Sequence, residues 1–141
     1  MTPRDPDFAA RIRSSFAQQG ALTALKAEMG AIEPGRCTIR APFGPAVTQQ
    51  AGLFHGGVIG TVADSAGGYA AMSLSEAGAE VVTVEYKINF LRPARGDWLE
   101  ARGHVLRAGR SLCVSQVEVS MVGGEVCAVM QQTIHVIAAV G

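Results

Sequence analysis

The sequence predicts an α+β fold in which one antiparallel sheet packs against a long buried helix. A helical pattern opens the chain, a run of small residues without proline covers residues 57–74, and strand-like segments fill most of the chain after residue 82. Consecutive strands joined by short turns form antiparallel sheets, and a helix that is apolar on most sides needs a surface to cover it. The sheet would provide that surface.

The length and composition favour a single domain that assembles into oligomers. The 141 residues fit one domain over 1–141, with an N-terminal helix in 1–20 and the core in 21–137. The 12 basic and 12 acidic residues cancel, so no long-range field attracts nucleic acid or an anionic membrane. A hydrophobic share of 48% favours an assembly that hides apolar faces. The first 20 residues contain no continuous apolar stretch, so we expect a cytoplasmic protein without a membrane segment.

The N-terminal part of the chain predicts a short amphipathic helix followed by a hairpin. Asp5 and Pro6 suit the N-cap and the first position of a helix that ends near Gly20. Its apolar residues recur every four positions, at Phe8, Ile12 and Phe16. The turn Glu33-Pro34-Gly35 then separates two extended runs. These runs are Lys26–Ile32 and Arg36–Ala41, and the loop Phe43–Phe54 follows them.

The segment from Gly57 to about Leu74 predicts a buried helix. It consists almost entirely of small and aliphatic residues, and Asp64 is its one charged side chain. Its length favours a helix over a strand. Each glycine costs a helix interior roughly 1 kcal/mol relative to alanine. Glycines at positions 60, 67 and 68 consequently indicate very close packing against a flat sheet.

Strand patterns account for the rest of the chain. From Val82 to Phe90 apolar residues alternate with polar ones, and Pro93 ends this run. Three further runs follow, separated by the turns Ala108-Gly109 and Gly123-Gly124. They are Trp98–Arg107, Ser111–Met121 and Val126–Ile137.

The sequence His55-Gly56-Gly57 lies where the long loop becomes the predicted helix. The first N–H groups of a helix have no partner within it, and the helix dipole adds roughly half a positive charge at that end. Glycine leaves these groups open to a ligand. The Gly56 N–H would polarise a thioester carbonyl and stabilise the oxyanion that forms on attack.

Asp64 is the candidate base or nucleophile of the same site. A lone carboxylate in an apolar helix is costly, and it is usually either a hydrogen-bonded structural acid or a catalytic one. Eight residues of helix separate it from Gly56, which is about 12 Å along the axis and about 80° around it. One carbonyl cannot contact both. The two residues would therefore meet across a dimer, with the helix end of one subunit facing Asp64 of the other.

Two roles remain open for Asp64. It could act as a general base on water, or as a nucleophile that forms a mixed anhydride. Gln49, in the loop before the helix, can both donate and accept hydrogen bonds, so it could hold the water or the carbonyl. A solvated loop glutamine is the alternative interpretation.

These residues resemble hotdog-fold acyl-CoA thioesterases of the phenylacetate-degradation (PaaI) type and the 4-hydroxybenzoyl-CoA thioesterase-like family. The resemblance covers roughly residues 20 to 137. It depends on Asp64 and on three segments: Gln49–Gly57, Thr83–Tyr86 and Phe90–Ala94. It implies a sheet that wraps around the central helix, dimers with two shared sites, and a homotetramer built from those dimers.

The resemblance also implies roles for individual residues. It assigns the oxyanion role to Gly56, substrate orientation to His55, and the base or nucleophile to Asp64. Thr83 corresponds to a serine or threonine near the reacting centre of related enzymes. Family members commonly have asparagine where Gln49 stands, and some relatives have glutamine.

A CoA substrate has phosphates that need cations and backbone donors. Arg92, Arg107 and Arg110 lie at predicted strand ends, and Gly57 at the helix start, so these four residues form the predicted CoA-binding set. Ordinary solvated turn charges are the alternative for the arginines. His104 and His135 have no third ligand nearby in sequence, so we expect no metal and no cofactor.

The predicted function is hydrolysis of an acyl-CoA to a carboxylic acid and free CoA. A non-catalytic acyl-CoA-binding protein of the same fold is the main alternative. A hydratase or dehydratase of this fold would need a catalytic histidine paired with an acid, a motif that the sequence lacks. A purely structural role is the last alternative. The acyl group is open between aryl, short and medium chains.

Overall fold

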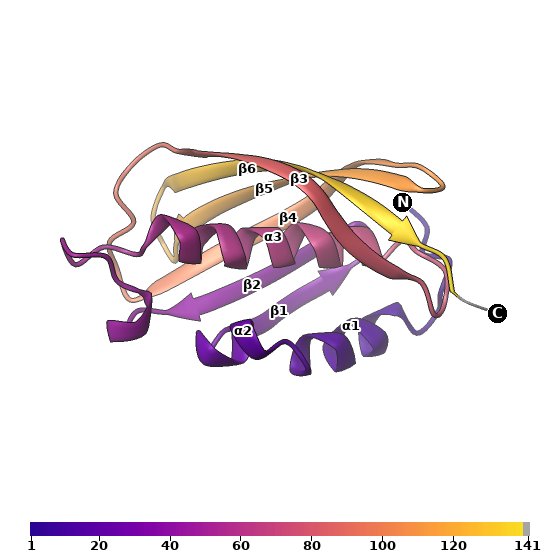
Figure 1. The fold of residues 1–141 in the computed structure, drawn as a ribbon, viewed down its shortest axis with the longest axis horizontal. Helices are drawn as coiled ribbons and strands as arrows, with labels where there is room; N and C mark the ends of the chain where they lie inside the picture. The colour runs from indigo at the N-terminus through magenta and orange to yellow at the C-terminus, as the bar shows by residue number, and fades with distance from the viewer. Residues whose placement is uncertain (140–141) are drawn as a thin grey trace.

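The computed structural model describes residues 1–139 and places one long helix, α3 (Gly56–Met72), across a six-stranded sheet (Figure 1). All strand pairs are antiparallel, and the strand order is β1-β2-β4-β5-β6-β3. The strands are β1 (Glu28–Glu33), β2 (Arg36–Pro42), β3 (Glu80–Phe90), β4 (Trp98–Ala108), β5 (Leu112–Met121) and β6 (Val126–Ile137). The predicted α+β fold is confirmed.

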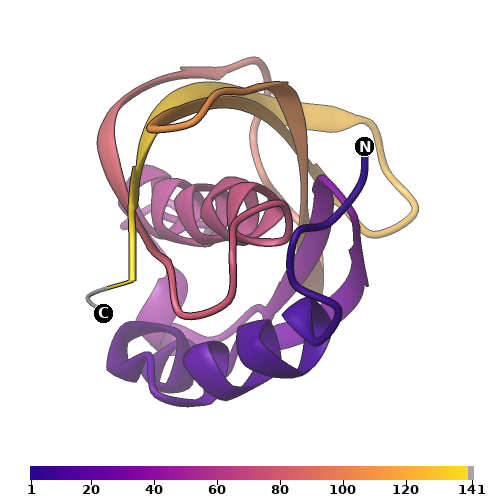
Figure 2. The same cartoon turned by 90° about the vertical axis from the view of Figure 1, so that its right-hand side faces the viewer.

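The sheet curves around α3 and leaves one side of the helix to the N-terminal segment. Figure 2 shows the sheet arching over the helix, with α1 (Phe8–Ala17) and α2 (Gly20–Ala24) on the side that the arch leaves open. The inner positions of the sheet and most of α3 form one buried core. The three cysteines, Cys37, Cys113 and Cys127, lie in that core, and burial raises the pKa of the Cys37 thiol to about 12.

The N-terminal prediction is correct about the presence of a helix and wrong about its start and length. Asp7, not Asp5, precedes α1, and a second short helix follows it. The Asp5 carboxylate instead accepts hydrogen bonds from the Asp7 N–H and from Arg11. These two donors hold the pKa of Asp5 below its ordinary value. Asp5 thus closes the turn before the helix and orients Arg11.

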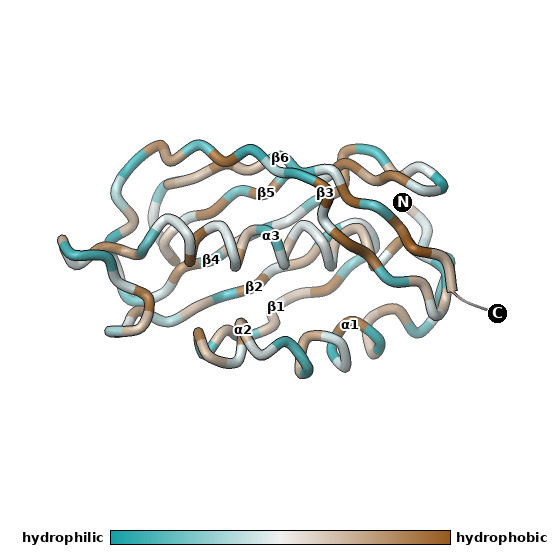
Figure 3. Tube along the Cα trace, in the orientation of Figure 1, coloured by the Kyte–Doolittle hydropathy of each residue, from teal (hydrophilic) through white to brown (hydrophobic). Residues whose placement is uncertain are grey.

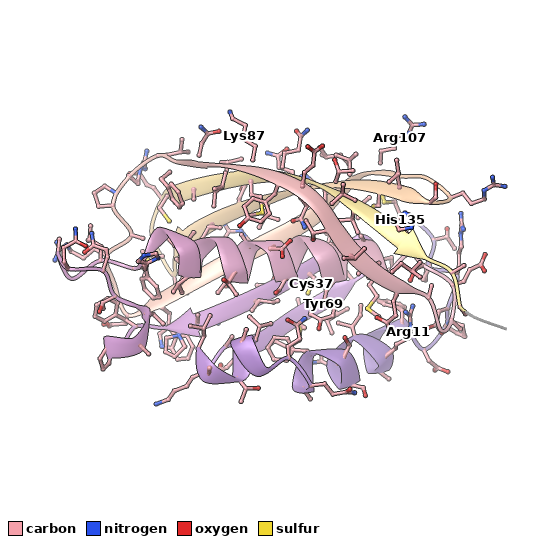
Figure 4. All side chains as sticks on the ribbon, in the orientation of Figure 1. Arg11, Cys37, Tyr69, Lys87, Arg107 and His135 are labelled. Atoms are coloured by element: carbon pink, nitrogen blue, oxygen red, sulfur yellow. The ribbon has the colours of Figure 1, made fainter. Side chains whose placement is uncertain are left out.

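Arg11 fastens α1 to the segment that follows α3. Its guanidinium donates to the Ala79 carbonyl at 2.7 Å and to Ser75 Oγ at 3.1 Å. The Tyr69 hydroxyl bonds Ser15 at 3.1 Å and Gln19 at 2.6 Å, which joins the last turn of α1 and the N-cap of α2 to α3. Figure 4 shows Tyr69 lying between the two helices. The N-terminal helix is therefore held at two places along α3.

A β-bulge divides β3 into two halves. The pairing register with β6 shifts between Thr83 and Glu85, so Val84 is an extra residue. Without the bulge, Thr83 and Tyr86 would face opposite sides of the sheet. With it, both face α3, since Thr83 bonds a side chain of that helix and the Tyr86 hydroxyl lies against Gly60. The predicted unbroken alternation from Val82 to Phe90 is wrong at this point.

Two of the three helix glycines differ sharply in their surroundings. A Cβ on Gly67 would overlap Gln132 Oε1 and lie 2.7 Å from Ser115 Oγ, so α3 approaches the sheet closely there, as predicted. A Cβ on Gly68 would have no neighbour within 4 Å. The close-packing prediction is therefore confirmed at Gly67 and wrong at Gly68.

Candidate active site

The Asp64 side chain is held by residues from two strands. Thr83 Oγ1, on β3, donates to Asp64 Oδ1 at 2.6 Å. Gln132 Nε2, on β6, donates to the same oxygen at 3.0 Å. No described residue donates to Asp64 Oδ2. One carboxylate oxygen is fixed by two donors, and the other remains available for chemistry.

A cavity of about 340 Å³ opens beside this carboxylate. Its walls come from α1, α3 and the first half of β3, and it includes Asp64, Thr83, Gly68, Tyr69 and Met72. Asp64 is partly exposed here, whereas Tyr69 and Met72 are buried. The cavity is large enough for a small acyl group and combines polar with apolar lining.

The bulge in β3 is what brings Thr83 to the site. Because Val84 is the extra residue, the strand can turn both Thr83 and Tyr86 toward α3. Thr83 pairs with the fully buried Ile134 on β6, which places its hydroxyl inside the sheet's curve. Thr83 thus contacts Asp64, the predicted reacting carboxylate, through a hydrogen bond. Its role in catalysis stays a prediction.

The start of α3 presents a free backbone donor. His55 is the N-cap, and its Nδ1 accepts a hydrogen bond from the Gly57 N–H at 2.8 Å. The Gly56 N–H has no acceptor among residues 1–139. The Phe90 ring packs over Gly56, where a Cβ would lie 3.0 Å from it. Gly56 therefore combines an unpaired N–H with a surface where a side chain would crowd the Phe90 ring.

Gly56 and Asp64 do not come together within one chain. They lie on the same straight helix, about 12 Å apart along its axis. Asp64 has Thr83 and Gln132 as neighbours, whereas Gly56 has Phe90. The two residues therefore stay apart within one chain, and their meeting across a dimer stays a prediction.

Gln49 is engaged in its own loop. The side-chain Oε1 of Gln49 accepts hydrogen bonds from the Ala51 and Leu53 N–H groups. The backbone N–H of Gln49 donates to the Leu53 carbonyl at 2.9 Å. These bonds shape the turn that precedes His55. Only the Nε2 of Gln49 is left to contact a substrate.

The predicted CoA-binding arginines lie at two different ends of the molecule. Arg92 follows β3 on the Gly56 side and forms an ion pair of 2.5 Å with Glu125. Arg107 and Arg110 lie at the end of β4 and in the turn after it. Figure 4 shows Arg107 near the C-terminal end of α3, with its side chain pointing away from the helix. One chain therefore does not gather the three arginines around Gly57.

Gln132 is a site residue that the sequence interpretation missed. A signal for it exists, because Ala128, Met130 and Ile134 alternate as fully buried residues and Gln132 interrupts their series. In a strand with one buried face, a polar residue in the apolar phase needs a partner. That partner, Asp64, is far away in sequence and could not be identified from the strand alone.

Among residues 1–139, no group of three or more histidine, cysteine or acidic side chains is arranged to hold a metal ion. The described helices include none that is both long and apolar enough to cross a membrane.

Comparison with known proteins connects this geometry to one family. Residues 51–128 match the model of the thioesterase superfamily. A thioesterase family protein from Silicibacter pomeroyi has a crystal structure that is 40% identical, with a TM-score of 0.90, over 94% of this chain and 99% of that one. The E. coli PaaI protein from the phenylacetic acid degradation operon, at 22% identity, shares the fold with a TM-score of 0.87 over 96% of this chain and 97% of that one.

Two of the curated relatives align over shorter stretches. A protein of Saccharolobus solfataricus is 37% identical over 87 residues, which are 62% of this chain and 61% of that protein. Acyl-coenzyme A thioesterase 13 of Mus musculus is 32% identical over 74 residues, 52% of this chain and 52% of that protein. The resemblance to PaaI-type hotdog proteins is thus confirmed for family and fold.

Proposed function

Since the chain belongs to the thioesterase superfamily, we propose that it hydrolyses an acyl-CoA to a carboxylic acid and free CoA, with Asp64 as the reacting carboxylate. The observation that carries this proposal is the asymmetric environment of Asp64. Oδ1 accepts two hydrogen bonds, whereas Oδ2 accepts none from the described residues and belongs to a residue lining a cavity. The mouse relative named as an acyl-CoA thioesterase supports CoA as the thiol.

Two routes fit this geometry. In the first, Oδ2 takes a proton from water while the water oxygen bonds to the thioester carbonyl carbon. In the second, Oδ2 itself bonds to that carbon, and water later cleaves the mixed anhydride. In both, the C–S bond breaks, the sulfur leaves as CoA thiolate and takes up a proton, and the acyl group leaves as a carboxylic acid.

The Gly56 N–H supplies the oxyanion donor in either route. It is unpaired, it begins a 17-residue helix, and the dipole of that helix favours negative charge at this end. His55 caps the helix through Nδ1, which keeps the Gly57 N–H occupied and leaves Gly56 as the donor. His55 and the Nε2 of Gln49 orient the thioester beside it.

A complete site requires a second copy of the chain. β3 is an edge strand that pairs with β6 on one side only, and its exposed side chains include Val82 at 49% and Val84 at 61%. Figure 3 shows hydrophobic residues interleaved with polar ones along this edge. A long apolar edge is a ready surface for strand pairing. Antiparallel pairing of two β3 strands would set Gly56 of one subunit against Asp64 of the other.

The dimer is thus the minimal active unit, and a homotetramer would be a pair of such dimers. In the dimer, Arg92 of one subunit and Arg107 and Arg110 of the other are available to the CoA phosphates, whereas the N–H of Gly57, the fourth residue of the predicted CoA-binding set, is engaged by His55. The acyl group enters the cavity beside Asp64, where Tyr69 and Met72 form part of the wall.

The test is substitution of Asp64 by Asn, assayed by thiol release. The substrates are phenylacetyl-, benzoyl-, butanoyl- and octanoyl-CoA. We expect kcat to fall about 100- to 10,000-fold, the usual range for loss of a general base. Asp97→Asn makes the same charge change on an exposed residue and is the matched control. Wild-type turnover in Asp64→Asn would refute the role of Asp64, and binding of all four substrates without turnover by the wild-type protein would favour a binding protein.

A further inference from the structure

Gln132 is a polar side chain on the buried face of β6. It is 1% exposed, and its neighbours on that face, Met130 and Ile134, are fully buried. Burying a carboxamide among apolar side chains is unfavourable unless hydrogen bonds replace those to water. The contacts of this carboxamide therefore need a specific explanation.

The NH₂ group of Gln132 faces Asp64. Nε2 lies 3.0 Å from Asp64 Oδ1, 3.2 Å from the Asp64 carbonyl oxygen and 3.4 Å from Thr83 Oγ1. A carbonyl and a carboxylate oxygen can only accept hydrogen bonds, so the opposite orientation of the amide would place acceptor against acceptor. The direction of the amide is fixed by these partners.

The carbonyl oxygen of the Gln132 amide lacks the hydrogen bond that would stabilise it. Gln132 Oε1 and Ser115 Oγ are buried and have no hydrogen-bond partner within residues 1–139. Ser115 lies directly opposite Gln132 in the β5–β6 ladder, and both atoms occupy the space that a side chain on Gly67 would need. Helix and sheet are thus shaped around a carboxamide whose oxygen is unpaired. Such departures from good packing are typical of functional sites.

We propose that Gln132 is a positioning residue that holds the Asp64 carboxylate in its reactive orientation, an inference that rests on the proposed function. Thr83 and Gln132 reach Oδ1 from different strands, β3 and β6, so together they fix the rotation of the carboxylate. Oδ2 is thereby kept as the oxygen that reacts. Without Gln132 the carboxylate keeps one donor and gains rotational freedom.

The test compares two neighbouring glutamines of β6. Gln132→Met keeps the length of the side chain and removes the donor. Gln131→Met makes the same change on the exposed face and is the matched control. Gln132→Leu also removes the NH₂ group and adds no charge, so it provides a second variant if Gln132→Met fails to fold. Each protein is assayed with the same four acyl-CoA substrates.

We expect kcat to fall roughly 10- to 100-fold in both Gln132 variants, the size of effect that a misplaced catalytic group causes, while KM stays near the wild-type value. Gln131→Met should keep both constants. In the Asp64→Asn background, Gln132→Met should cause no further loss, because a residue that acts through Asp64 has nothing left to position.

Wild-type kcat in a folded Gln132 variant would overturn the inference, as would a change in KM alone. An added loss in the double variant would show that Gln132 acts independently of Asp64 and would also overturn it. These outcomes are distinct from failure of the proposed function, which full activity of Asp64→Asn alone would reveal.

Discussion

Gly56 contributes a backbone group rather than a side chain to the proposed site. Its N–H is unpaired, and the Phe90 ring occupies the side where a Cβ would lie. A substitution that adds a Cβ perturbs Phe90 without removing the donor. A substitution by proline, which has no backbone N–H, removes the donor itself. Alanine and proline at position 56 separate these two effects.

We predict that Gly56→Pro lowers kcat about 100- to 1,000-fold, the usual cost of one oxyanion donor. Proline is well accepted at the first position of a helix, and His55 already has the extended ψ of 135° that a following proline requires. Gly56→Ala introduces the same contact with Phe90 but keeps the N–H, so we expect a smaller loss. Thiol release measures kcat, and thermal unfolding checks the fold; equal losses in the two variants would contradict the donor role.

Asp64 was identifiable from the sequence because it is the one charged residue in an apolar helical segment. Thr83 and Gln132 were harder to identify, since their importance depends on contacts between elements that are distant in the chain. Resemblance suggested Thr83, whereas the interrupted apolar alternation at Gln132 gave no indication of its partner. Local pattern shows which residue is unusual, and only the packed structure shows which residue is its partner.

Among the elements, β3 departs most from its sequence pattern. The alternation from Val82 to Phe90 looks continuous, yet the bulge at Val84 reverses which residues face the helix. The pattern contains no proline or glycine that would mark the bulge. The N-terminal helix was misjudged for a similar reason, because Asp5 resembles an N-cap but bonds Arg11 instead. The other strands and α3 were predicted to within a few residues.

The contact between α3 and the sheet leads to a stability prediction for adjacent glycines. Gly67→Ala would force its Cβ against Gln132 and Ser115, so we expect a loss of about 1–3 kcal/mol in the free energy of unfolding. Gly68→Ala meets no atom within 4 Å and should stabilise the helix by up to about 1 kcal/mol. Urea unfolding of both variants checks this. If both substitutions changed the free energy of unfolding in the same direction, the result would contradict the packing described around Gly67 and Gly68.

For the whole molecule, the central feature of the proposed site is its division into two halves. One half consists of Asp64, Thr83 and Gln132, and the other is the start of α3 with Gly56. The dimer and the tetramer stay predictions, because they depend on further copies of the chain. The single-domain organisation also stays a prediction. Sharing of the site is testable without knowing the tetramer arrangement.

We predict that two inactive variants recover activity when they share a dimer. Asp64→Asn and Gly56→Pro, co-expressed with different tags and purified through both, would leave one complete site of two in each heterodimer, or up to about half of wild-type activity. The control pairs Asp64→Asn with Thr83→Val, which alter the same half-site and should recover little. A Gly56→Pro heterodimer that is no more active than its parents would contradict the shared site.

The strand order also sets when the Asp64 carboxylate acquires its surroundings during synthesis. β3 is made before β4, β5 and β6, yet its one partner among the described strands is β6, the last of the six to be made. Until then neither edge of β3 has a partner, and long-range pairings of this kind form slowly and expose strands to aggregation. Gln132 lies on that last strand. The nascent chain therefore completes the environment of Asp64 at the end of folding, when the edge that would recruit a second copy is also formed.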